Sequence, residues 1–476
     1  MRKKIVRGVL IALAAIILYL VIGATAPFVR IKKMEDTNHA DEIVNRVMTD
    51  RDSPDRAKIV ETNQSALEER IRLIHMAKEN IVLCTFDMRE GESTSDILAM
   101  LYKKAEEGVR VQILVDGISG FIRMQGVPLF LTVAQHENIQ IRIYNKLNPL
   151  LPWKAMGCMH DKYLIVDHEA YILGGRNTFD YFIGEYETER MSFDREVLIY
   201  NTVPSDQESS VYELYDYFDK MWDYGECSVY DGEGLSDADR KEMRVFLENR
   251  YESIRTQYPE LFEAFDYTQC TYETKGVTLL ANETHIYSKE PVVFYELTEI
   301  MKRAKNRVIL HTPYVVMDDE MQEKIKDVCQ NVPVTMMVNA RENGDNLVAS
   351  SDYTWHRQDV LDTGVHLLEY MGGVSYHGKS AVIDEDIAIV GSYNLDMRST
   401  YVDTELMAAV RSKEVAQELA GYMEGLHRDC REVAADGTEE IPPHLSEAPA
   451  CEPLNFSQKA VFRLLGLVMQ LFRVFV

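Results

Sequence analysis

The sequence has few of the features that mark disulfide-rich, metal-binding or disordered proteins. Its seven cysteines are scattered and never stand in C-x-x-C spacing, which argues against a disulfide framework and a zinc site. Proline and glycine number only 14 and 25, while 46% of the 476 residues are hydrophobic. This composition excludes collagen-like and disordered chains. The length exceeds that of one ordinary core and predicts two or more packed units.

Basic residues are also in deficit. Lysine and arginine total 51 against 77 aspartates and glutamates, a formal net charge of −26. Such a surface repels nucleic acid unless a basic cleft lies within it. We therefore expect no nucleic-acid partner.

A long apolar run is present at the N-terminus. Residues 9–22 are apolar, and small residues continue the run to Ala26, before Pro27. The preceding residues include four cations: Arg2, Lys3, Lys4 and Arg7. The run is about long enough to span a bilayer, so residues 1–30 are predicted to form a single-pass anchor. A cleaved signal peptide is the alternative, because Ala24-x-Ala26 has the spacing of a cleavage site. Because cations flank the run on both sides, the sequence does not determine on which side of the membrane the body lies.

A second apolar segment lies at the C-terminus. Residues 431–453 are predicted to form a linker, followed by a helix within residues 454–476. Four polar residues of this segment fall on one helical face: Lys459, Arg463, Gln470 and Arg473. This pattern predicts an amphipathic helix that lies on a bilayer surface with its cations toward headgroups. The alternative is a helix packed on the body.

The region between these ends contains an internal repeat. Strand-like residues 81–86, a helical pattern over 94–108 and a second strand at 109–115 form a βαβ pattern. The same order recurs at residues 307–312, 319–329 and 334–338. The sequence therefore predicts an α/β fold with two repeated units, residues 55–204 and 289–430. Residues 205–288 are predicted to be a connector with two helices.

One motif occurs once in each unit. The first copy has His160, Lys162 and Asp167, followed after six residues by Gly174-Gly-Arg-Asn177. The second copy keeps the same spacing with these residues: His377, Lys379, Asp384, Gly391, Ser392 and Asn394. Two copies at matching positions of a repeat indicate a functional site.

The chemistry of the motif suits a phosphodiester. In an extended H-x-K segment the histidine and lysine share one face, and the glycine turn brings the asparagine back toward it. A cation and an amide donor bind phosphate oxygens, and an imidazole serves as nucleophile or general acid. Two copies would let one histidine attack phosphorus while the other protonates the leaving oxygen. The candidate phosphate-binding residues are Lys162, Asn177, Lys379, Ser392 and Asn394.

Carboxylates are expected to support these groups. Each histidine needs a carboxylate that fixes its tautomer, and we assign Glu196 and Glu405 to this role. Asp167 and Asp384 end the motif strands, far from the histidines, and are expected to hold a loop or the motif lysine. We expect no metal or other cofactor, because the lysine of each motif would repel a dication.

The two motifs are those of the phospholipase D superfamily, whose pattern is HxKx4Dx6G[GS]xN. The second half is similar to bacterial cardiolipin synthases, through Gly391 to Ser399, Asp403-Thr-Glu405 and the stretches 346–352 and 364–370. The resemblance implies two phospholipase D-like α/β units packed around one pseudo-twofold active site. It also implies a phosphorylated histidine and no metal. By this resemblance His160 is the nucleophile, and His377 is the general acid and later the base.

The resemblance and the two membrane-directed ends predict the same substrate class. We expect an enzyme of the bacterial cell membrane that joins two phosphatidylglycerol molecules into cardiolipin and releases glycerol. Hydrolysis to phosphatidic acid is the main alternative. A phosphodiesterase that acts on nucleic acid and an inactive membrane scaffold are further alternatives. The oligomeric state stays open.

Overall fold

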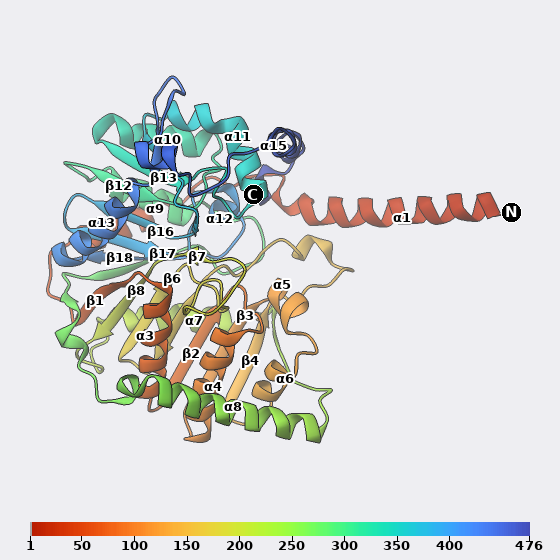
Figure 1. Ribbon diagram of the computed structural model, residues 1–476, viewed down its shortest axis with the longest axis vertical. Helices are drawn as coiled ribbons and strands as arrows, with labels where there is room; N and C mark the ends of the chain where they lie inside the picture. The colour runs from red at the N-terminus through yellow and green to blue at the C-terminus, as the bar shows by residue number, and fades with distance from the viewer. Residues whose placement is uncertain (1) are drawn as a thin grey trace.

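Two nine-stranded sheets, packed face to face, form the centre of the computed structural model, which describes residues 2–476 (Figure 1). The first sheet has the order β10-β1-β8-β6-β5-β2-β3-β4-β9. Its strands are β1 (Asp55–Val60), β2 (Asn80–Thr85), β3 (Arg110–Asp116), β4 (Ile139–Tyr144), β5 (Tyr163–Val166), β6 (Ala170–Gly174), β8 (Glu196–Asn201), β9 (Cys227–Val229) and β10 (Tyr272–Glu273).

The second sheet repeats this topology, with the order β11-β18-β17-β16-β12-β13-β14-β19-β20. Its strands are β11 (Val277–Ala281), β12 (Val308–His311), β13 (Val334–Asn339), β14 (His366–Tyr370), β16 (Lys379–Ile383), β17 (Ile387–Gly391), β18 (Leu406–Arg411), β19 (Cys430–Val433) and β20 (Glu439–Glu440). In each sheet three parallel strands, β2-β3-β4 or β12-β13-β14, adjoin an antiparallel hairpin, β5-β6 or β16-β17. The predicted α/β fold with two repeated units is confirmed.

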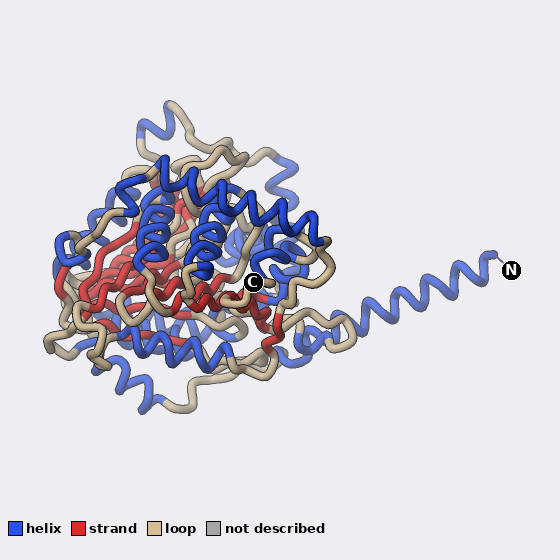
Figure 2. The backbone as a smooth tube through the Cα atoms, turned by 90° about the horizontal axis from the view of Figure 1, so that it is seen from below, coloured by secondary structure: helices blue, strands red, loops and turns tan. Residues whose placement is uncertain are grey.

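Helices cover the outer face of each sheet, as Figures 1 and 2 show. The first unit carries α3 (Asn63–Met76), α4 (Glu92–Glu106), α6 (Pro128–Ala134) and α8 (Asp237–Gln257). The second carries α2 (Thr37–Met48), α9 (Val292–Met301), α10 (Asp319–Asn331) and α11 (Leu347–Leu361). Short helical turns are α5 (Gly117–Ser119), η3 (Pro152–Lys154), α12 (Met397–Tyr401) and α14 (Pro443–Glu447).

A shared apolar layer joins the two sheets. Leu173 and Ile199 of the first sheet belong to the same buried cluster as Val390 and Val410 of the second. Two helices reach across this layer: α7 (Ser210–Trp222) contacts β11, and α13 (Lys413–His427) contacts β1. The two units are therefore closely packed parts of one body.

The segments between the predicted units contain more structure than expected. Residues 205–288 hold α7 and α8, but they also supply β9 and β10 to the first sheet and β11 to the second. Residues 431–453 hold β20 and α14. Three of these strands, β9, β10 and β20, have only two or three residues, too few for a recognisable period in a sequence.

The two ends of the chain differ in how they pack. Helix α1 (Arg2–Thr25) projects from the body, and the described segment Lys3–Phe28 is long and apolar enough to cross a membrane (Figures 1 and 2). Helix α15 (Phe456–Met469) lies along α11. Gly466 allows this close approach, because a Cβ there would lie 2.3 Å from Cδ1 of Trp355.

Candidate active site

The two motif histidines lie at the interface of the two units. Main-chain contacts with the opposite unit hold both of them. The His160 N–H donates to the carbonyl of Thr404 (3.3 Å), and the His377 N–H donates to the carbonyl of Phe193 (2.6 Å). Next to His377, β15 (Ser375–Tyr376) pairs with β7 (Ser192–Phe193). The fold thus brings both motifs to one place.

His160 contacts a carboxylate of the other unit. Its Nδ1 lies 2.8 Å from Oε1 of Glu405. Glu405 is fully buried and also accepts hydrogen bonds from the hydroxyls of Ser392 and Ser399. The ring of Phe86 packs against His160 at 5.1 Å between centroids. With Nδ1 directed at Glu405, Nε2 is the nitrogen available for chemistry.

His377 has an equivalent arrangement. Its Nδ1 lies 2.7 Å from Oδ2 of Asp194, again a residue of the opposite unit. The ring of Phe182 packs 5.1 Å away, and the Lys379 ammonium lies 3.8 Å from Asp194. Each histidine is therefore oriented by a carboxylate from the other half of the chain.

The assignment of Glu196 to a histidine is corrected by these contacts. Glu196 is buried against the guanidinium groups of Arg70, at 2.5 and 2.8 Å, and Arg176, at 3.4 Å. The strand register gives the reason. Gly174 pairs with Glu196, whereas Gly391 pairs with Met407, so the residue equivalent to Glu405 is Asp194.

The second residue of each glycine turn faces the supporting carboxylate of its own unit. At Gly175 a Cβ would lie 2.4 Å from Oδ1 of Asp194, so only glycine fits there. The equivalent Ser392 donates its hydroxyl to Glu405. That hydroxyl is engaged by the carboxylate, in contrast to the predicted role of Ser392 in binding phosphate.

The two motif aspartates lie at the far ends of β5 and β16. Asp167 accepts hydrogen bonds from the N–H groups of Lys78, Glu79 and Asn80 at 2.7–2.9 Å. Asp384 accepts equivalent bonds from residues 305–307. They hold the turns that precede β2 and β12, and they do not contact the motif lysines. Of the two predicted roles, both aspartates therefore have that of holding a loop.

The lysines and asparagines line the site between the histidines. The Lys162 ammonium donates to the His160 carbonyl, and the Lys379 ammonium lies 2.6 Å from Nδ1 of His377. Asn177 Oδ1 accepts from the Asp87 N–H at 3.2 Å. Asn394 Oδ1 is buried without a hydrogen-bond partner among residues 2–476. Cationic and amide groups of this kind bind phosphate oxygens.

Burial and nearby charge shift the pKa values of these groups. Burial lowers the pKa of His160 well below its usual value, and Lys162 and Lys379 lower it further. The pKa of Lys162 falls to about 8 because of burial. Burial and Lys379 also lower the pKa of His377, while Asp194 opposes that change.

The pKa values of the two supporting carboxylates are shifted in opposite directions. Burial alone would raise the pKa of Asp194, but Lys379 and His377 outweigh it and hold that pKa below its usual value. Burial raises the pKa of Glu405 well above the usual range, although Lys162 opposes it. Asp194 therefore stabilises a protonated histidine better than Glu405 does.

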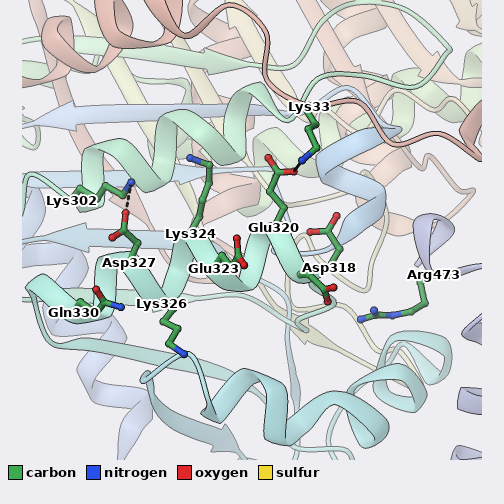
Figure 3. Close-up of a pocket in the computed structure, with 11 residues that line it drawn as sticks. Lys33, Lys302, Asp318, Glu320, Glu323, Lys324, Lys326, Asp327, Gln330 and Arg473 are labelled. Atoms are coloured by element: carbon green, nitrogen blue, oxygen red, sulfur yellow. Dashed lines mark ion pairs between the residues drawn. The ribbon is translucent and has the colours of Figure 1, made fainter.

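No other cluster in the described chain offers comparable chemistry. Residues 2–476 contain no group of three or more His, Cys, Asp or Glu side chains arranged to hold a metal ion. A groove of about 950 Å³ lies over α10, but charges of both signs line it and no motif residue takes part (Figure 3). The sequence analysis missed Phe86, Phe182 and Ser399 at the site, because only their spatial neighbours reveal them.

Two facing H-x-K motifs on repeated α/β units define the phospholipase D class of site. The chain belongs to the family described as "Cardiolipin synthase, PLD-like domain", whose model matches residues 70–222 and 297–427.

Known proteins with similar sequence or structure agree with this class. Cardiolipin synthase C of Escherichia coli is 23% identical over 406 residues, covering 75% of this chain and 82% of that protein. An uncharacterised protein of Helicobacter pylori is 24% identical over 391 residues, covering 73% and 74%. The fold is also similar to the crystal structure of a phosphatidylserine synthase from Haemophilus influenzae. The TM-score is 0.63 at 14% identity, over 93% of this chain and 100% of that one.

Proposed function

We propose that the protein is a phosphatidyltransferase that makes cardiolipin from two molecules of phosphatidylglycerol. The observation that carries this proposal is the pair of histidines, each with Nδ1 on a carboxylate of the other unit. Nε2 of each histidine is the nitrogen proposed to react, and at His377 it lies 3.2 Å from the Lys379 ammonium. Membership of the cardiolipin synthase family and the membrane-directed helix α1 support a phospholipid substrate.

The first half of the reaction transfers the phosphatidyl group to the enzyme. Nε2 of His160 attacks phosphorus, and the bond from phosphorus to the glycerol oxygen breaks. That oxygen takes the electron pair and a proton from Nε2 of His377, and glycerol leaves. Lys162 and Lys379 stabilise the negative charge on the phosphate oxygens.

The second half transfers the group to a lipid alcohol. A hydroxyl of the second phosphatidylglycerol gives its proton to His377, and its oxygen attacks phosphorus. The bond between nitrogen and phosphorus breaks and its electrons return to His160. The net products are one cardiolipin and one glycerol.

The opposite pKa shifts of the carboxylates support this division of roles. Attack requires an unprotonated Nε2. The strongly lowered pKa of His160 disfavours its charged form, and an Nδ1–H directed at Glu405 leaves Nε2 without a proton. Protonation of the leaving oxygen requires a charged imidazole, which the ionised Asp194 favours at His377. His160 is thus proposed as the nucleophile and His377 as the acid and base.

The proposed location is the bacterial cell membrane, with α1 as a single-pass anchor. From residue 9 to residue 22 the exposed side chains of α1 are apolar, which suits a hydrocarbon core. Removal of the segment as a signal peptide is the competing fate. N-terminal sequencing of the membrane-bound protein distinguishes them, since an anchor retains the residues before Ala26.

Lipid mass spectrometry tests the reaction. The full chain is reconstituted in phosphatidylglycerol vesicles with a chelator, beside a His160→Ala control. The proposal expects cardiolipin and glycerol in equal amounts from the unmodified chain alone. Phosphatidic acid as the sole product would make the enzyme a hydrolase, and turnover that requires a divalent metal would contradict the mechanism. Steep salt-dependent binding and cleavage of DNA would instead favour a nucleic-acid phosphodiesterase.

A further inference from the structure

The outer side of α15 is apolar, which is the reverse of a helix at a water-facing surface. Phe456 and Leu464 are 89% and 66% exposed. The exposed residues of α15 and of the segment just after it include six large hydrophobic ones, beside polar residues at 457–459 and 463: Phe456, Val461, Leu464, Leu467, Val468 and Leu471. Phe462 and Gly466 face α11 and are buried. A contiguous exposed apolar face on a helix marks an interaction surface.

Two of the four residues in the polar stripe of α15 and its tail face the body. For these two residues the predicted orientation toward headgroups is corrected. The side chains of Gln470 and Arg473 bind Asp352 at 3.1 and 2.9 Å, and Gln470 also contacts His356 at 2.8 Å. Asp352 is fully buried. These contacts fix the helix on α11 and leave its apolar side outward.

The other two cations of the stripe line a groove at the start of α15. Lys459 and Arg463 share this groove of about 590 Å³ with Arg341, and Trp355 and Phe462 form apolar walls. None of the three cations forms an ion pair within the described chain. No carboxylate lines the groove. The groove therefore has a net positive charge in a chain of net charge −26.

The groove over α10 provides a contrast. There Lys33 pairs with Glu320 at 3.3 Å and Lys302 pairs with Asp327 at 2.7 Å, as the dashed lines in Figure 3 show. Its cations are neutralised by the protein itself. The cations beside α15 lack such partners and are available to an external anion.

The chain end that follows α15 lies beside the root of α1. The rings of Phe28, just after α1, and Phe475, just after α15, pack at 5.5 Å between centroids. Figure 1 shows α15 end-on while α1 lies in the plane of the view, so the two axes cross steeply. A helix that crosses α1 in this way lies along the surface of a bilayer that α1 spans.

A loop of the first unit adds a third apolar element. The carbonyl of Leu150 accepts a hydrogen bond from Tyr19 of α1 at 2.9 Å, and the Leu150 side chain is 76% exposed. Trp153 is also exposed in this loop. The loop thus lies at the level of the last turns of α1, where a bilayer would begin.

We propose that α15 and the loop at Leu150 dock onto an anionic bilayer, with the groove of Arg341, Lys459 and Arg463 holding the phosphate of one anionic phospholipid. Apolar side chains enter the acyl boundary and the cations bind the headgroup. Arg341 also follows β13, whose Asn339 donates to the carbonyl of Tyr376, next to His377 (2.6 Å). The groove and the segment before His377 are thus connected through the end of β13. This docking needs no turnover and is independent of the reaction.

Photo-crosslinking tests the docking face. The full chain carries His160→Ala to prevent lipid conversion, and benzoylphenylalanine replaces either Leu464 or, as a control, the exposed Phe246 of α8. Both proteins are reconstituted in phosphatidylcholine vesicles with or without phosphatidylglycerol. Lipid adducts are expected at position 464 and not at 246. Equal yields at the two positions, or crosslinks from 464 to protein only, would overturn the docking face.

Charge reversal tests the groove. Lys459→Glu with Arg463→Glu is compared with a matched pair of exposed lysines elsewhere, Lys220→Glu with Lys241→Glu. Retained phosphatidylglycerol is counted by native mass spectrometry from nanodiscs. Each lost groove cation is expected to weaken retention about fivefold, while the control pair retains the lipid. Equal retention by both pairs, equal retention of phosphatidylcholine, or displacement by free glycerol phosphate would overturn the headgroup site.

Discussion

At the scale of single residues, the site depends on two carboxylates whose pKa values are shifted in opposite directions. Asp194 and Glu405 occupy equivalent places, yet Lys379 keeps the pKa of Asp194 low while burial raises that of Glu405. A charged carboxylate stabilises an imidazolium, and an uncharged one does so less well. Nearly symmetric motifs can thereby perform two different steps.

Replacement of Asp194 by Asn is expected to move the alkaline limb of the pH profile to lower pH. Asp194 raises the pKa of His377, so its loss lowers that pKa, and His377 loses its proton earlier as pH rises. Measured as kcat/KM against pH, the limb shifts while the protein stays folded. An unshifted limb would contradict the assignment of His377 as the acid.

Replacement of Glu196 by Gln provides the matched comparison. Glu196 compensates two buried guanidinium groups, so the change is expected to lower the free energy of unfolding by about 3 to 5 kcal/mol. The pH limbs of the surviving activity stay in place. A shifted limb would mean that Glu196 acts on the histidines after all.

These two residues also show what the sequence could supply at this scale. The spacing of the motifs identifies both histidines and both lysines as candidates without a structure. Asp194 and Glu196 are two positions apart on the same strand-like segment, so both side chains fall on one face and the pattern cannot separate them. Only the pairing of Gly174 with Glu196 shows which carboxylate is equivalent to Glu405.

At the scale of elements, the motif strands are held at both ends. Contacts from the opposite unit fix the end of each strand that carries the histidine. An aspartate with a left-handed backbone conformation fixes the opposite end. Asp167 and Asp384 have φ values of 48° and 53° and bind the N–H groups of the turns before β2 and β12. The aspartates of the motif therefore position the strands without contacting the motif lysines.

Replacement of Asp384 by Ala is expected to destabilise the protein without altering the chemistry. The turn of residues 305–307 loses its acceptor, at a cost of about 1 to 3 kcal/mol. Asp384→Asn keeps one oxygen and tolerates the positive φ, so it should lose less. Denaturant unfolding measures both variants. A larger loss of kcat than of stability would place Asp384 in the reaction instead.

Helices and strands could be predicted from the sequence where hydrophobic residues recur with a regular period. The expected helix at 94–108 and strand at 109–115 match α4 and β3 within two residues. The binding of part of the polar stripe of α15 and its tail to the body was not predictable. The period of a sequence defines a face, but what covers that face depends on buried partners such as Asp352, which are distant in the chain.

At the scale of the whole molecule, the duplication builds one site from two units that share a core. The apolar layer between the sheets contains residues of both, and each histidine takes its carboxylate across that layer. Neither unit could hold the site alone. Sequence repetition indicates the two units, but their face-to-face packing comes from long-range contacts.

The shared core predicts that both units unfold in one transition. Trp222 lies in α7 at the shared layer and Trp355 lies in α11 of the second unit, so variants that keep only one of the chain's three tryptophans report on these two places separately. The two melting curves are expected to coincide. Leu173→Ala in the shared layer should lower both by the same amount, equivalent to about 2 to 5 kcal/mol. Separate transitions would contradict a common core.

The most direct measurement of the central claim is the trapping of the covalent intermediate. His377→Ala lacks the acid and base, but it should still react with a phosphatidyl ester of p-nitrophenol, because p-nitrophenolate leaves without protonation. We expect a burst of p-nitrophenolate, and mass spectrometry under alkaline conditions should find a phosphatidyl group on His160. Neither is expected in His160→Ala. A phosphatidyl group on another residue, or a burst without any adduct, would contradict the central claim.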